Sequence, residues 1–93
     1  MISLKLNKIR KKLDKLDDNF LLLIKKRTSL VNQVIQTKRF KNQIVDNKRI
    51  KVILKRVKKK SLKMKIDTEI TNKIWKAMIR AFISYEFKNF KRK

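Results

Sequence analysis

One stretch decides the fold of this chain. Residues 4–40 read LKLNKIRKKLDKLDDNFLLLIKKRTSLVNQVIQTKRF. Apolar side chains recur in it at alternating steps of three and four, which places them along one face of an α-helix. These seam positions are Leu6, Ile9, Leu13, Leu16, Phe20, Leu23, Leu30 and Val34. The spacing therefore predicts one unbroken helix over residues 4–40, roughly 55 Å long at ~1.5 Å per residue.

A helix of this length is far longer than helices in most globular proteins. The rest of the chain is too short to cover its whole apolar seam. We therefore expect a second copy of the chain, or another partner, to pack against it.

The composition narrows the fold class and the chemistry. The 93 residues contain no Gly, Pro, Cys or His, which favours helices over tight turns and hairpins. Zinc sites, Ser–His or Cys–His nucleophiles and Gly-rich phosphate loops are excluded, so we expect no metal and no cofactor. No segment has the length of a membrane span, and residues 1–8 lack the apolar core of a signal peptide. We expect a cytoplasmic protein.

Two further helices follow a polar break at residues 41–45. Asp46 is suited to cap a second helix over residues 47–60, and Asp67 or Thr68 a third that ends near Phe90. Residues 61–66 are expected to form a linker, and Arg92 and Lys93 a cationic tail. The sequence therefore predicts a single all-α domain over residues 1–93 with three helices and a very long first one.

Arg27 interrupts the apolar seam, because it stands at the step between Leu23 and Leu30. A guanidinium buried in such a seam is costly unless it meets an opposite charge. No Asp or Glu occurs between Asp18 and Asp46. Arg27 therefore indicates a partner from outside the chain, most simply a bound anion.

Two other cations are related to Arg27 by their spacing. Lys38 lies eleven residues further on, about three helical turns, so both would share one face and could form an anion site. The alternative is that Lys38 extends into water. Arg10 lies seventeen residues before Arg27, roughly 25 Å along the axis. One small ligand could reach both arginines only if they came from two chains of an antiparallel-like dimer; otherwise Arg10 is an ordinary surface residue.

Glu86 is one of only two glutamates and falls on a predicted stripe with Trp75 and Phe82. An apolar setting would favour its protonated form, which can donate a hydrogen bond. The alternative is a surface carboxylate paired with Lys88 or Lys91.

The formal net charge is +22. Such a charge attracts polyanions, and the basic tract at residues 55–60 would suit nucleic acid. That tract has no interleaved aromatic residues, so a solvated helix end is the other reading. Arg49, in the first turn of the second helix, could be solvated or could reach a ligand.

Taken together, these residues resemble the all-helical chorismate mutase family. IRKKLDKLD at residues 9–17 resembles the opening L-R-x-x-I-D-x-L-D of that family. The further matches are LLLIKKR at 21–27 with L-L-x-L-L-x-x-R, VIQTK at 34–38 with V-x-x-x-K, VDNKR at 45–49 with V-x-D-x-x-R, and IWKAMI at 74–79 followed by Phe82 and Glu86 with the closing pattern.

The resemblance implies the Claisen-type rearrangement of chorismate to prephenate, on the route to phenylalanine and tyrosine, without metal or cofactor. It also implies an intertwined homodimer whose long first helices pair. Arg27 and the partner chain's Arg10 would bind the substrate carboxylates with help from Arg49. Lys38 and Glu86 would donate hydrogen bonds to the ether oxygen.

The resemblance further implies that Asp46 helps to place the substrate hydroxyl. Two pocket-lining positions depart from the pattern: Ile50 stands where Glu is common, and Phe82 where many members have Ser. A related isochorismate reaction stays open. The alternative functions are a basic helical module that binds nucleic acid and a structural coiled-coil partner. The coiled coil is disfavoured because an apolar residue would pack better than Arg27 in the seam.

Overall fold

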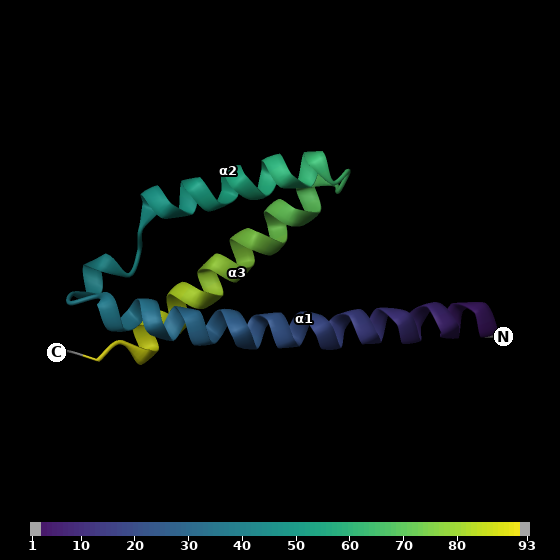
Figure 1. The fold of residues 1–93 in the computed structure, drawn as a ribbon, viewed down its shortest axis with the longest axis horizontal. Coiled ribbons are helices and arrows are strands. Elements are labelled where there is room, and N and C mark those ends of the chain that lie inside the picture. The colour runs from purple at the N-terminus through teal and green to yellow at the C-terminus, as the bar shows by residue number, and fades with distance from the viewer. Residues whose placement is uncertain (1–2, 92–93) are drawn as a thin grey trace. The chain divides into compact units, whose positions relative to one another are not determined.

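The computed structural model describes residues 3–91, and the predicted cationic tail at Arg92 and Lys93 lies outside this range. These residues form the α-helices α1 (Leu4–Thr37), α2 (Asn47–Lys63) and α3 (Thr68–Asn89) (Figure 1), with a short 3₁₀ helix, η1 (Lys41–Gln43), after α1. No strand occurs within residues 3–91. The all-α prediction with a very long first helix is therefore confirmed.

The predicted end of the first helix at Phe40 is wrong, because α1 ends at Thr37. The side chain of Gln43 provides the reason. Its Oε1 atom accepts hydrogen bonds from the backbone N–H groups of Arg39 at 2.7 Å and of Phe40 at 3.0 Å. A side-chain acceptor of this kind competes with the helical hydrogen bonds and stabilises the turn. Lys38 consequently lies just beyond the end of α1.

The chain divides into two compact units, Met1–Leu30 and Val31–Lys93. The first unit consists of most of α1, and its seam is exposed: Leu13 is 53%, Leu16 63% and Leu23 63% accessible. The apolar face that the sequence pattern predicts is therefore not buried within this unit.

The start of α2 is capped as predicted. The Asp46 side chain accepts a hydrogen bond from the backbone N–H of Arg49 at 3.0 Å. This bond satisfies one of the N–H groups that lack a partner in the first turn of a helix. The first turn of α2, which carries Arg49 and Ile50, is thereby fixed.

The predicted linker at residues 61–66 is mostly wrong, because α2 continues to Lys63. The turn that follows has Lys65 in the left-handed region, with φ 58°. The Ile66 N–H bonds to the Ser61 carbonyl at 2.8 Å and the Lys65 N–H to that of Leu62 at 3.2 Å. These two bonds form a Schellman motif, which ends the helix without the glycine that usually does so.

Helices α2 and α3, which this turn connects, pack against each other (Figure 1). Val57 of α2 and Ile79 of α3 are buried. The Ser61 and Thr71 hydroxyl oxygens, also buried, lie 2.8 Å apart in a hydrogen bond between the helices. Asp67 caps α3 by accepting from the Glu69 N–H at 2.8 Å. Within residues 3–91, no helix is both long enough and apolar enough to cross a membrane.

Candidate active site

Two residues 48 positions apart in the sequence form the centre of the candidate site. Lys38 Nζ donates a hydrogen bond to Glu86 Oε1 at 2.9 Å. Their side chains are only 15% and 11% accessible. Lys38 Nζ also donates to the Ile44 backbone carbonyl, at 3.3 Å. The ammonium group is thus held between a carboxyl oxygen and a main-chain oxygen in a setting largely closed to water.

The local sequence explains this contact. The end of α1 at Thr37 releases Lys38 from the helix, and η1 brings the Ile44 carbonyl to its ammonium group. Glu86 lies on the buried stripe of α3, 8% accessible. Both alternative readings are therefore wrong: Lys38 does not extend into water, and Glu86 is not a surface partner of Lys88 or Lys91. The Lys38 ammonium group also has a carboxylate partner within the chain, which is Glu86.

A second contact in the same unit was missed by the sequence reasoning. The Tyr85 hydroxyl donates to Asn32 Oδ1 at 2.8 Å, which ties α3 to the last turns of α1 one residue before Glu86. The half-buried Phe82 packs edge-on against Tyr85, with ring centroids 6.4 Å apart and an interplanar angle of 76°. Neither Asn32 nor Tyr85 stood out, because a single polar residue on an exposed helix face carries no periodic signal.

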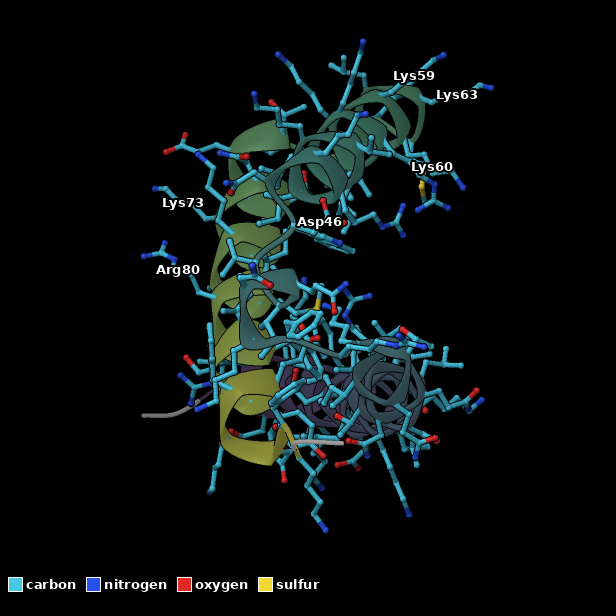
Figure 2. The ribbon with its side chains drawn as sticks, turned by 90° about the vertical axis from the view of Figure 1, so that its left-hand side faces the viewer. Asp46, Lys59, Lys60, Lys63, Lys73 and Arg80 are labelled. Atoms are coloured by element: carbon cyan, nitrogen blue, oxygen red, sulfur yellow. The ribbon has the colours of Figure 1, made fainter. Side chains whose placement is uncertain are left out.

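The other candidates at α2 are more exposed. Asp46 and Arg49 both face solvent, and Asp46 Oδ1 is occupied by the Arg49 N–H. Figure 2 shows Asp46 where the chain enters α2. Ile50 is half-buried. A groove between α2 and α3, lined by Leu54 and Asn72 among others, includes none of the candidate residues.

The remaining two candidates belong to the first unit, Met1–Leu30. Arg27 is half-buried in α1 although its seam neighbours Leu23 and Leu30 are 63% and 61% accessible. The next residue, Thr28, donates from Oγ1 to the Ile24 carbonyl at 2.8 Å. Arg10 is exposed.

Comparison with known proteins identifies the family of this chain. The model of a family described as chorismate mutase type II matches residues 9–87, most of the 93-residue chain. No curated protein and no solved structure matches. The matched range contains every candidate site residue from Arg10 to Glu86, and it supports the isomerase rather than the nucleic-acid-binding alternative. The chain therefore belongs to the chorismate mutase type II family, and its function is that family's isomerase reaction.

Proposed function

We propose that this chain rearranges chorismate to prephenate at the position where Lys38 meets Glu86. In that reaction the ether C–O bond breaks while a C–C bond forms within one molecule, so no atom is gained or lost. The protein must hold a compact conformer and stabilise the charge that develops on the ether oxygen. Two hydrogen-bonding groups held close together in a setting poor in water suit that task, and the contact between Lys38 and Glu86 carries the proposal.

The two groups have different roles in the proposal. Lys38 donates as an ammonium group, and the substrate oxygen takes the place that Glu86 Oε1 occupies in the free protein. Glu86 can donate only when it carries a proton, because a carboxylate only accepts. The proposal therefore predicts that turnover falls as the pH rises.

A pH–rate profile of Glu86→Gln tests this role directly. The Gln amide donates at every pH, so the variant should keep its rate at alkaline pH where the parent loses it. Glu69→Gln is the matched control, because Glu69 is exposed and pairs with Lys73. A parent profile that is flat from mildly acidic to alkaline pH contradicts the role of Glu86.

Turnover itself is measured from the loss of chorismate absorbance with purified protein. Lys38→Ala should lower kcat by about 10²–10³, the usual effect of removing one donor at a developing oxyanion. Lys73→Ala removes a lysine with the same 2.9 Å carboxylate contact but 74% side-chain exposure, and should not change kcat. Isochorismate as a second substrate tests the related reaction. No turnover by the folded parent would refute the proposal.

The substrate carboxylates are assigned to arginines. Chorismate is a dianion, and guanidinium groups bind carboxylates in a bidentate manner. In the proposal Arg27 and the Arg10 of a second chain hold them, and the exposed Arg49 assists. Asp46 places the substrate hydroxyl through the oxygen that does not cap α2. Ile50 and Phe82 line the pocket.

We further propose that the chain works as an intertwined homodimer. Large apolar side chains along α1 are exposed in the first unit, as Leu13, Leu16 and Leu23 illustrate. In the second unit α3 leaves a separate stripe uncovered, with Ile70 54% and Ile74 39% accessible. Apolar surface of this extent on a small chain is typical of a subunit interface, and a self-complementary seam favours a second copy.

Mixing two inactive variants tests the shared site. If each site takes Arg10 from one chain and Arg27 from the other, Arg10→Ala and Arg27→Ala are each inactive. Refolding them together as equal mixtures should restore about a quarter of the parent activity, because half of the dimers are mixed and each has one intact site. Sites built within one chain would give no recovery, and a fully active monomer would refute the dimer.

The product would enter the route to phenylalanine and tyrosine, and we place the reaction in the cytoplasm. Growth without these two amino acids, restored by the parent but not by Lys38→Ala in a host lacking the reaction, checks the first part. Fractionation of the host cell checks the second.

A further inference from the structure

The solvent-facing side of α2 is strongly basic, and apart from Arg49 at its start it is not used by the proposed reaction. Every cation of this helix is exposed, while Ile53, Leu54, Val57 and Ser61 turn towards α3. Figure 2 shows Lys59 and Lys63 extending from α2 on the side opposite to Lys73 and Arg80 of α3. The exposed cations of α2 are Lys48, Arg49, Lys51, Lys55, Arg56, Lys58, Lys59, Lys60 and Lys63.

Four of these lysines form a row at intervals of four residues, which we call the lysine row: Lys51, Lys55, Lys59 and Lys63. Residues at this interval are neighbours on a helix surface, so each consecutive pair repels. No Asp or Glu occurs between Asp46 and Asp67, and α2 therefore has no carboxylate of its own to offset the repulsion. An external anion would relieve it.

The length of the row decides the kind of anion. Twelve residues of helix at ~1.5 Å each make the row roughly 18 Å long, so a single small dianion cannot contact all four ammonium groups. A chain of regularly spaced phosphates can. Lysine contacts phosphate as a point charge, and because α2 carries no aromatic residue, contact with a nucleic acid would be to its backbone and not by stacking on bases.

A membrane surface fits this face less well. An interfacial helix inserts an apolar face, but the apolar face of α2 is covered by α3. The large apolar side chains left exposed on this helix are Val52 and Leu62, which interleave with the lysines. We infer that the lysine row is a second functional surface of this protein, which binds the phosphate backbone of a nucleic acid without reading its sequence.

The inference is tested with a fluorescently labelled duplex DNA of about 20 base pairs and the full chain, by anisotropy between about 50 and 200 mM salt. Each phosphate contact contributes about 0.9 to the slope of log affinity against log salt, so four contacts contribute about 3.6, or about 150-fold across this range. Substituting the whole row, Lys51→Gln, Lys55→Gln, Lys59→Gln and Lys63→Gln, should reduce the slope by that amount. The double substitution Lys55→Gln with Lys59→Gln should reduce the slope by half of that amount. It provides the test if the fourfold variant does not fold.

A matched control removes the same charge elsewhere. Lys8, Lys11, Lys15 and Lys25 are exposed and lie on the side of α1 opposite to its apolar seam. Their fourfold change to Gln should leave most of the slope intact. An equal loss in both variants would show general attraction by net charge and would overturn the inference. So would tighter binding of phosphatidylserine vesicles, or competition by polyglutamate as effective as that by DNA. Chorismate turnover should be unchanged in both variants, so the outcome does not depend on the proposed reaction.

Discussion

The contact between Lys38 and Glu86 should stabilise the fold far more than the exposed ion pair between Lys73 and Glu69. Both pairs have an N···O distance of 2.9 Å, but the Lys73–Glu69 side chains are 74% and 72% accessible, against 15% and 11% for Lys38–Glu86. The two pairs therefore have the same N···O distance and differ in how far their side chains are buried. Replacing Lys by Met and Glu by Gln, singly and together, gives a double-mutant cycle for each pair.

The expected magnitudes follow from this difference. At an effective dielectric constant of about 20, two charges 2.9 Å apart attract by about 6 kcal/mol before the cost of removing them from water. Desolvation cancels most of this for a pair that is largely buried, so we expect a coupling free energy of about 2 kcal/mol for Lys38–Glu86. The exposed pair is solvated and screened, and should couple by less than about 0.5 kcal/mol.

Urea unfolding followed by helical circular dichroism measures both cycles, at one fixed protein concentration because the stability of the proposed dimer would depend on it. High salt should abolish the coupling of Lys73–Glu69 and leave most of that of Lys38–Glu86. Equal coupling of the two pairs, or a Lys38–Glu86 term below about 0.5 kcal/mol, would refute the conclusion that these groups meet in a protected setting.

Three further predictions concern the turns and caps that position the site. Lys65→Gly should raise the free energy of unfolding by about 1 kcal/mol, because glycine adopts a positive φ without steric cost; an unchanged urea midpoint would contradict this. Asp46→Ala should destabilise by about 1 kcal/mol through loss of the cap of α2, whereas Asp46→Asn, which keeps an acceptor, should cost little in the same titration. Ser61→Ala should cost about 1 kcal/mol because the Thr71 hydroxyl then keeps only its 3.3 Å bond to the Thr68 carbonyl, and Thr71→Val in the Ser61→Ala background should cost less than in the parent; additive losses would argue against the coupling.

The caps and faces of the helices were accessible to sequence reasoning because they depend on neighbours a few residues apart. Asp46 caps α2 as expected, and Asp67, one of the two expected candidates, caps α3. Glu86 falls on a buried stripe because its spacing from Trp75 and Phe82 is helical. Each of these features follows from local periodicity and backbone hydrogen bonding.

The end of α1 was not accessible in the same way. Nothing at Thr37 resembles a usual stop signal, since the chain has neither Gly nor Pro. The helix ends because the Gln43 side chain binds the amides of Arg39 and Phe40 from beyond the turn. The extension of α2 to Lys63 depends on a left-handed lysine, which sequence propensity disfavours.

The sequence by itself determined that this chain is helical and that its first helix is too long for one small core. It put Glu86 on a stripe with Trp75 and Phe82 but left a surface position open. Only the tertiary structure decided that Glu86 meets Lys38, and it did so by ending α1 one residue before that lysine. The physical reason is one of range. A helical period reports which side of a helix is apolar, whereas a contact between residues 48 positions apart depends on how turns and packed helices direct the chain through space.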